Sequence, residues 1–164
     1  MSEIILTATQ IEHKLERMAF QILEANSNND TIIIAGILKN GYAVAVQIAT
    51  FLEKNSSKEI LRCEINMDKK NPNTQISTSL KESEYINKSV TIVDDVLHSG
   101  TTLIYAVRHF LNVPLAQCKT AVLIDRNHKK FPIKADFKGL SLSTSINENV
   151  VVLIESTGMT AVLE

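Results

Sequence analysis

The sequence predicts an α/β domain with a central, mainly parallel sheet flanked by helices. Two observations support this fold class. Short runs rich in isoleucine and valine recur along the chain, as in strands that are buried on both faces. Segments whose apolar residues repeat every three or four positions separate several of these runs, as in helices. Strands that alternate with helices are typical of a parallel sheet covered on both faces.

The first half of the chain is expected to hold a helix and then a β-α-β unit. Thr7 to Gln10 has the pattern of a capping box, and the apolar residues that follow lie on one helical face as far as about Asn26. The remaining elements of this half are a strand over 31–35 that ends at Gly36, a helix over 42–52 and a strand over 59–67.

The second half continues the pattern after a long polar segment. Residues 68–88 contain few apolar anchors, so we expect a structureless stretch that serves as a flexible lid or is disordered. The elements expected after it are a strand over 90–93, a helix over 101–111, and strands over 119–124, 136–142 and 150–154. The sequence has no internal repeat, and residues 1–164 are expected to form one domain.

The charge balance excludes a broadly basic protein. Lys and Arg number 17 against 18 Asp and Glu in 164 residues, a net charge of −1, so no general attraction to nucleic acid or to a membrane is expected. No apolar run approaches the ~18 residues of a membrane span, and the start lacks a leader-like stretch. We therefore expect a soluble, cytoplasmic protein. Cys63 and Cys118 lie in strand-like runs and are expected to be free thiols rather than metal ligands or a disulfide.

The clearest chemical signal lies in residues 90–102. A buried strand delivers Asp94 and Asp95, and a small, hydroxyl-rich turn over Ser99 to Thr102 follows at the start of a helix. Backbone N–H groups at a helix N-terminus, together with hydroxyl donors, are suited to a phosphomonoester. Two carboxylates beside that turn can accept hydrogen bonds from sugar hydroxyls or approach Mg²⁺. The segment therefore indicates a site for a ribose 5-phosphate.

Either half of this segment alone has a simpler explanation, namely a solvated Asp-Asp turn or an ordinary Ser/Thr helix cap. A nucleotide triphosphatase is disfavoured, because the lysine of its phosphate loop is absent. The whole pattern is a hydrophobic strand, two acids, two apolar residues, His98 and then Ser99-Gly100-Thr101-Thr102. It resembles the signature of the type I phosphoribosyltransferase family. The resemblance implies that family's fold, with a small hood and a flexible lid loop beside the central sheet.

The resemblance also implies a reaction and the residues that carry it. The family transfers a phosphoribosyl group from 5-phosphoribosyl-1-diphosphate to a nitrogenous base with Mg²⁺ as cofactor. The residues implied as catalytic are Asp94, Asp95 and His98. Those implied to bind ribose 5-phosphate are Ser99, Gly100, Thr101 and Thr102, and those implied to bind diphosphate are Leu38, Lys39, Asn40 and Gly41. The metal would be approached by Asp94, Asp95 and Glu155, and a cis peptide bond is expected at Leu38–Lys39.

The C-terminal third is most similar to the bacterial bifunctional pyrimidine-operon regulators and uracil phosphoribosyltransferases. The similarity lies in a strand, an Asp125-Arg126 turn and the segment Pro132 to Gly139. It implies that Asp125 and Arg126 bind the base. Enzymes for 6-oxopurines usually have lysine in place of Asp125, so a pyrimidine such as uracil is favoured. A surface ion pair between Asp125 and Arg126 is the alternative.

Several positions depart from this pattern. Asn40 and Thr101 replace arginines, and His98 replaces a tyrosine. Lys69 or Lys70 would have to replace an arginine of the lid, without its forked geometry. His98 could relay a proton at the base or be only a polar loop residue.

These departures leave two other functions open. One is a nucleotide-sensing, RNA-binding regulator of pyrimidine genes with weak or no transferase activity. The basic tract from Lys119 to Lys138 favours it, whereas the lack of an aromatic stacking platform does not. The other is an assembly subunit that binds no diphosphoribosyl compound. The resemblance further implies a homodimer or homotetramer.

Overall fold

The central sheet carries the site and has six strands in the order β4-β3-β2-β5-β6-β7. The computed structural model describes residues 2–143, 145 and 147–164. The strands of this sheet are β2 (Thr31–Ile37), β3 (Glu59–Asn66), β4 (Ser77–Thr78), β5 (Ser89–Leu97), β6 (Gln117–Asp125) and β7 (Phe137–Ser141). Only β4 runs antiparallel to its neighbour; the other pairs are parallel. The predicted α/β class with a mainly parallel sheet is confirmed.

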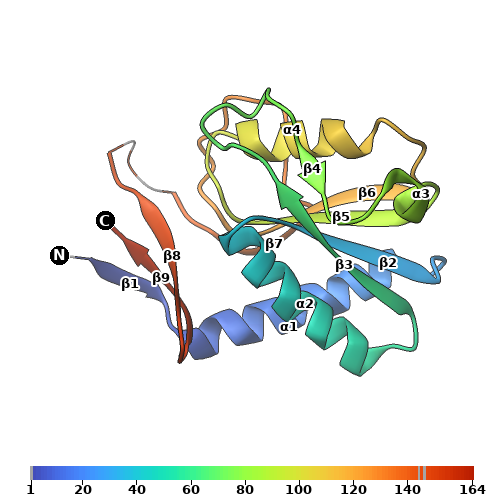
Figure 1. Cartoon of the computed structure of the whole chain (residues 1–164). Helices are drawn as coiled ribbons and strands as arrows, with labels where there is room; N and C mark the ends of the chain where they lie inside the picture. The colour runs from blue at the N-terminus through green and yellow to red at the C-terminus, as the bar shows by residue number, and fades with distance from the viewer. Residues whose placement is uncertain (1, 144, 146) are drawn as a thin grey trace.

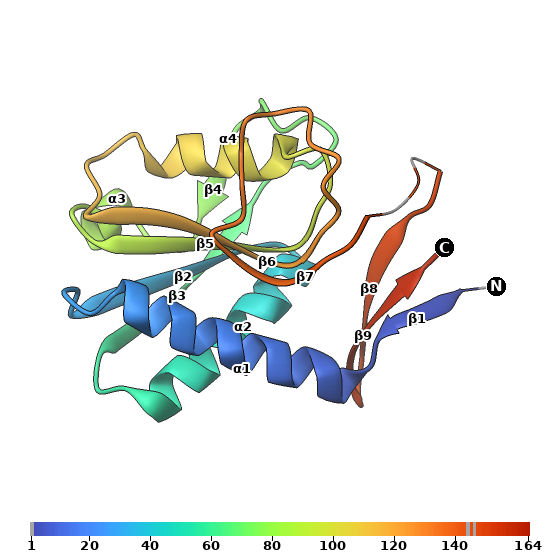
Figure 2. The same cartoon turned by 180° about the vertical axis from the view of Figure 1, so that it is seen from behind.

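Helices cover both faces of this sheet (Figures 1 and 2). On one face lie α1 (Ala8–Ala25) and α2 (Asn40–Asn55), and on the other lie α3 (Glu82–Tyr85) and α4 (Thr101–Phe110). The predicted capping box at Thr7 starts α1, with the Thr7 side chain accepting from the Gln10 N–H. The buried residues of α1 repeat at helical spacing, so the sequence pattern and the packing agree.

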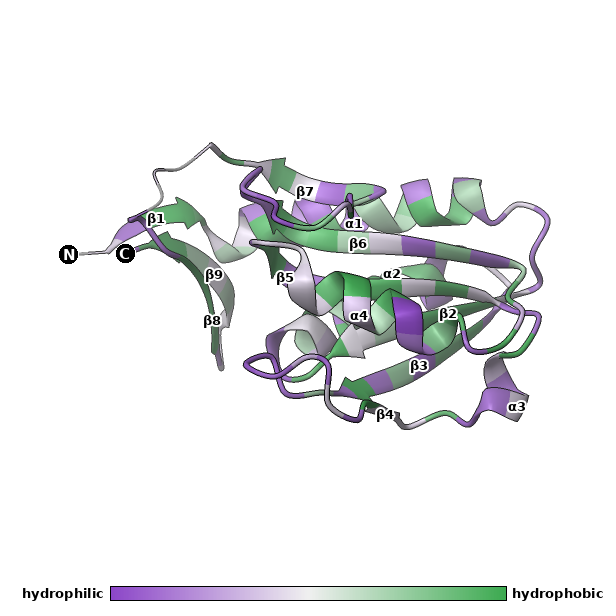
Figure 3. Cartoon of the chain, turned by 90° about the horizontal axis from the view of Figure 1, so that it is seen from above, coloured by the Kyte–Doolittle hydropathy of each residue, from purple (hydrophilic) through white to green (hydrophobic). Residues whose placement is uncertain are grey.

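A second, smaller sheet stands beside the first and forms the expected hood. Its strands are β1 (Glu3–Leu6), β9 (Gly158–Leu163) and β8 (Val150–Glu155), in the order β1-β9-β8 and all antiparallel. Figure 3 shows this sheet at the end of the domain, with the hydrophobic stretches of β5 and β6 beside it in the centre. Val150, Val152, Met159 and Ala161 join the core cluster of α1 and α2, which fixes the hood to the domain.

Several element boundaries differ from those predicted, and three differences change the description of the chain. Gly36 does not end its strand, because β2 continues to Ile37. β5 continues to Leu97, so the two acids lie within the strand rather than after it. The segment 68–88 is not structureless, because it contains β4 and α3, and the prediction was wrong for its second half. Tyr85 supplies the missing apolar anchor: it is 1% exposed, and its ring centroid lies 4.9 Å from that of Phe110.

The two cysteines are free thiols, as predicted. Cys63 is buried in β3 and Cys118 lies on β6. Burial raises the pKa of both thiols, that of Cys118 to about 11, so neither is an activated nucleophile. Among the helices that the structure describes, none has the length and apolar content needed to cross a membrane.

Candidate active site

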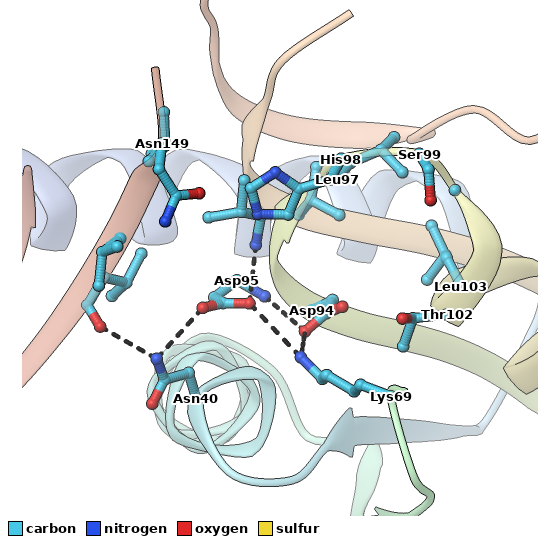
Figure 4. Close-up of a pocket in the computed structure, with 16 residues that line it drawn as sticks. Asn40, Lys69, Asp94, Asp95, Leu97, His98, Ser99, Thr102, Leu103 and Asn149 are labelled. Carbon is cyan, nitrogen blue, oxygen red and sulfur yellow. Dashed lines mark hydrogen bonds and ion pairs between the residues drawn. The ribbon is translucent and has the colours of Figure 1, made fainter. Parts of the chain in front are cut away.

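One cavity of about 310 Å³ lies at the carboxyl end of β5, between the starts of α2 and α4 and the strand β8 (Figure 4). This is the edge of a parallel sheet at which ligands usually bind. The segments that line this main cavity are Asn40 of α2, Lys69 of the loop after β3, the stretch Asp94–Gly100, Thr102 and Leu103 of α4, Val122, and Asn149–Val152. Most of the predicted signature therefore meets in one place.

The acid pair forms the floor of the main cavity. Asp94 is buried, and its Oδ1 accepts from Lys69 Nζ at 3.2 Å and from the Asp95 N–H at 2.9 Å. Asp95 Oδ1 accepts from the Val96 N–H at 2.9 Å and lies 3.9 Å from Lys69 Nζ. Burial raises the pKa of Asp94 from 3.8 to about 7, the charge of Asp95 adds to this effect, and Lys69 opposes it. A cation or hydroxyl donors placed here would relieve the repulsion between the two carboxylates.

The start of α2 approaches the acid pair closely because of Gly41. A Cβ atom on Gly41 would lie 2.9 Å from Asp94 Oδ1 and 2.9 Å from the Val93 carbonyl oxygen. The peptide bond Leu38–Lys39 just before it is cis, as predicted from the family resemblance. Asn40 Nδ2 donates to Asp95 Oδ2 at 3.2 Å and to the Val152 carbonyl at 3.0 Å. Asn40 therefore joins the central sheet to the hood at the site.

The turn between β5 and α4 has the form expected of an anion-binding loop. Gly100 has a φ of +90°, and a Cβ atom there would lie 2.4 Å from Ile133 Cγ2. The Ser99 and Thr101 hydroxyl oxygens are 2.8 Å apart, and the Thr101 N–H donates to Ser99 Oγ at 3.3 Å. Thr102 lines the cavity at the first turn of α4, where the helix dipole and unpaired N–H groups favour an anion.

His98 and Arg126 pair at the opposite end of the cavity from α2. Arg126 Nη1 lies 3.0 Å from His98 Nδ1, and Arg126 Nη2 donates to the carbonyls of Ser145 at 3.2 Å and Glu148 at 2.5 Å. Partial desolvation of the imidazole ring lowers the pKa of His98, although the residue as a whole is exposed, and the charge of Arg126 lowers it further. The neutral imidazole is therefore the form favoured here.

Comparison with known proteins decides the family. The family described as "Phosphoribosyl transferase domain" matches residues 1–155. The chain belongs to this family, and its enzyme class is phosphoribosyltransferase. A relative from Streptococcus mutans, named "Bifunctional protein PyrR", is 30% identical over 151 residues, which are 90% of this chain and 86% of the relative. A relative of the same name from Pediococcus pentosaceus is 30% identical over 164 residues, with 94% and 93% covered.

Solved structures of phosphoribosyltransferases share the fold. The hypoxanthine phosphoribosyltransferase of Trypanosoma cruzi superposes with a TM-score of 0.79 at 17% identity, covering 97% of this chain and 95% of that one. A hypoxanthine-guanine phosphoribosyltransferase from Bacillus anthracis superposes with a TM-score of 0.76 at 18% identity, with 98% and 96% covered. At these identities the likeness concerns the fold.

Within this phosphoribosyltransferase, some predicted site residues do not line the main cavity. Lys39 is exposed, whereas Lys69, which was considered only as a substitute for the lid arginine, reaches the acid pair. Thr101 does not line the cavity either, and its hydroxyl is hydrogen-bonded to the Ser99 hydroxyl. Glu155 ends β8 at the hairpin with β9, three residues beyond Val152, and is not on the cavity wall. Its assignment to a metal stays a prediction.

Asp125 and Arg126 do not behave as a surface pair, because both are buried. Asp125 Oδ1 accepts from the Asn127 N–H at 3.0 Å, and its Oδ2 lies 3.6 Å from Lys129 Nζ. Neither residue lines the main cavity, although Arg126 reaches it through His98. Their role in base binding stays a prediction.

Sequence reasoning missed the hood side of the cavity, Asn149–Val152. These residues precede and begin a strand whose apolar pattern was recognised, but nothing local in the sequence indicates that this strand faces the end of β5. The sequence offered one indication, the family resemblance at Glu155. It indicated the correct strand, but Glu155 lies at the end of that strand that does not line the cavity.

The site suits Mg²⁺ only as part of a complex with substrate. Asp94 and Asp95 offer the hard oxygen ligands that Mg²⁺ prefers. In the part of the chain that the structure describes, no cluster of three or more His, Cys, Asp or Glu side chains is arranged to hold a metal ion. The two carboxylates therefore fit a metal whose other ligands are oxygens of the substrate.

Proposed function

We propose that the chain transfers the phosphoribosyl group from 5-phosphoribosyl-1-diphosphate to a pyrimidine base such as uracil, in a Mg²⁺-dependent reaction that releases diphosphate. The observation that carries this proposal is the meeting of three features in one cavity. The same 310 Å³ space is lined by the acid pair Asp94 and Asp95, by Ser99, Gly100 and Thr102 of the turn at the start of α4, and by the loop lysine Lys69. The family assignment supports the same reaction class.

The 5-phosphate is assigned to the turn Ser99–Thr102. Gly100 lets the turn adopt its left-handed backbone, and the first-turn N–H groups of α4 and the hydroxyls of Ser99 and Thr102 would donate to phosphate oxygens. The ribose then extends toward Asp94 and Asp95, whose carboxylates would accept hydrogen bonds from its two hydroxyls. This order matches the order of the groups along the cavity wall.

The diphosphate is assigned to the space between the start of α2 and the loop after β3. Backbone groups of Leu38–Gly41 and the Asn40 amide lie on one side, with Lys39 nearby and Lys69 on the other side. Mg²⁺ held by Asp94, Asp95 and the substrate would neutralise charge on the leaving diphosphate. Lys69 would leave the carboxylates and pair with the diphosphate as it gains charge.

The base is assigned to the end of the cavity near His98, with Asp125 and Arg126 behind it. The C1–O bond to diphosphate breaks with oxocarbenium character at C1, and the base nitrogen attacks from the opposite face. The loop that carries Lys69 would exclude water from C1 while the transfer proceeds. A pyrimidine is preferred because the similarity to uracil phosphoribosyltransferases extends through Asp125 and the segment after it.

The test is diphosphate release from 5-phosphoribosyl-1-diphosphate with Mg²⁺ across a panel of bases. We expect release that depends on the base, is largest with a pyrimidine and is lost in the double variant Asp94→Asn/Asp95→Asn. A matched control is Asp68→Asn/Asp136→Asn, which removes the same charge from two carboxylates that do not line the cavity. Absence of release with every base would refute the transferase proposal.

A second candidate, binding of RNA, is supported by one feature of the surface. A second hollow of about 470 Å³ is lined by His98, Ser99 and the loop Arg126–Lys130. Its cations would face phosphates, although Lys129 is paired with Asp125, and Lys134 of the same tract lies 3.9 Å from Asp136. Binding of leader RNA that weakens steeply with salt would support this function, and no binding at low salt would refute it.

The proposed homodimer or homotetramer is a separate question from the chemistry of the site. Size-exclusion chromatography coupled to light scattering tests it directly. A monomeric mass at micromolar concentration would refute it.

A further inference from the structure

The His98 ring separates two concave surfaces of the molecule. It lines the main cavity together with Asp95, and it also lines the second hollow together with Arg126. One edge of the ring is directed at Arg126 through Nδ1. The other ring nitrogen, Nε2, makes no hydrogen bond to any residue that the structure describes, so it is available to a ligand.

Arg126 is held too firmly to be a freely moving ligand group. Its side chain is largely buried, and its backbone N–H donates to the Leu97 carbonyl at 3.1 Å. Its Nη2 donates to two carbonyls of the segment before β8, those of Ser145 and Glu148. These contacts place the guanidinium between the end of β5, the end of β6 and the approach to the hood, which fixes the direction of Nη1 toward His98.

The bond between Arg126 and His98 has only one possible direction. A guanidinium carries five N–H donors and no acceptor, and it stays protonated in proteins. At a distance of 3.0 Å, Nδ1 of His98 must therefore be the acceptor and carry no proton. The proton of the neutral ring is then on Nε2, which becomes a hydrogen-bond donor.

The charges around the ring agree with a neutral imidazole. Partial desolvation of the ring lowers the pKa of His98 most, although the residue as a whole is exposed; Arg126 and Lys69 lower it further, and Asp95 opposes them. A neutral ring with Nδ1 occupied has no lone pair to offer a ligand. His98 therefore fits a hydrogen-bond donor to the base better than the proton relay considered from the sequence.

We propose that Arg126 is a positioning residue that holds His98 as an Nε2–H donor, and that this donor selects bases that present an acceptor to it. The acceptor would be a carbonyl oxygen of the base. An ionised carboxylate at the same place would make the opposite selection, because it can only accept and so requires an N–H on the base. This inference rests on the proposed function and names the feature of the substrate that the site recognises.

The first test reads the tautomer without any reaction. ¹⁵N NMR spectra of the full chain distinguish a protonated from an unprotonated ring nitrogen, and His98→Asn assigns the signals. We expect unprotonated Nδ1 and protonated Nε2 in the wild type, a mixture of tautomers in Arg126→Gln, and recovery of the wild-type pattern in Arg126→Lys, whose ammonium is also only a donor. A proton on Nδ1 in the wild type would overturn the proposal, even if Arg126→Gln fails to fold.

The second test compares two bases of similar shape. Uracil presents a carbonyl oxygen where cytosine presents an amino group, so the ratio of their kcat/KM values reports which kind of group the site prefers. We expect the wild type to favour uracil, and His98→Asp to shift the ratio toward cytosine by about tenfold or more, as expected for exchange of one hydrogen bond. An unchanged ratio would overturn the selection by His98.

The two tests separate this inference from the proposed function. If no base supports turnover in the wild type, the transferase proposal fails, and the NMR result still decides whether Arg126 fixes the tautomer. If turnover is present but the tautomer is wrong, only the inference fails.

Discussion

Replacing Asp94 with asparagine should stabilise the protein at neutral and basic pH while it removes activity. The Asp94 carboxyl has a pKa of about 7 in the folded protein against a usual 3.8, so the folded state keeps a proton that the unfolded state has lost. Stability from this group is complete below pH 4 and decreases as the pH rises to about 7. Above that pH the deprotonated carboxyl costs about 4 kcal/mol. Asparagine carries no charge and avoids this cost.

Urea unfolding of the wild type and Asp94→Asn at several pH values measures this effect. We expect the variant to be more stable by about 4 kcal/mol near pH 8 and by about 2 kcal/mol near pH 5. The control is Asp68→Asn, because the Asp68 carboxylate is exposed and hydrogen bonds from the Lys70 N–H and the Asn71 side chain lower its pKa. A stability gain for Asp94→Asn that does not grow with pH would show that the pKa of Asp94 is not raised in the folded protein.

Three further predictions test the parts around the acid pair. Gly100→Ala forces a side chain into a positive φ and to 2.4 Å from Ile133 Cγ2, so it should cost about 1–3 kcal/mol and abolish binding of ribose 5-phosphate, measured by urea unfolding and calorimetry. Lys69→Met removes the cation 3.2 Å from Asp94 and should raise the KM for 5-phosphoribosyl-1-diphosphate about tenfold in steady-state kinetics. Tyr85→Ala should cost about 3 kcal/mol in urea unfolding, because Tyr85 is buried against Phe110; no loss would mean that this segment is not packed.

Most of the central sheet was predictable because its longer strands each carry their own signal, whereas the two-residue strand β4 was not predicted. A parallel strand buried on both faces must be apolar nearly throughout, and β2, β5 and β6 are. The meeting of Asp94, Asp95 and the Ser99–Thr102 turn followed from the same reasoning, since they are contiguous in sequence. These parts depend on local chain properties.

The parts that were missed depend on contacts between distant residues. β1 has four residues and is held by pairing with β9, more than 150 residues later, so its strand form has little local signal. Gly36 was interpreted as a strand end, but β2 needs it because a Cβ atom there would lie 2.5 Å from Tyr42 Cα of α2. Lys69 lies in a polar loop without periodicity, and only the folded chain brings it to Asp94.

Three side chains that depart from the family pattern make bonds within the site. These bonds argue against a site that has lost its ability to bind a substrate. Asn40, which stands in place of an arginine, donates to Asp95 and to the hood. Lys69 neutralises Asp94, and His98 accepts from Arg126. Two adjacent carboxylates, one of them buried, would destabilise the fold without such partners. Asn40, Lys69 and His98 each make a specific bond to a charged group of the site, whereas the Thr101 hydroxyl bonds to that of Ser99. The site therefore holds an energetically costly pair of acids together with partners for them, as expected if the acids bind a substrate.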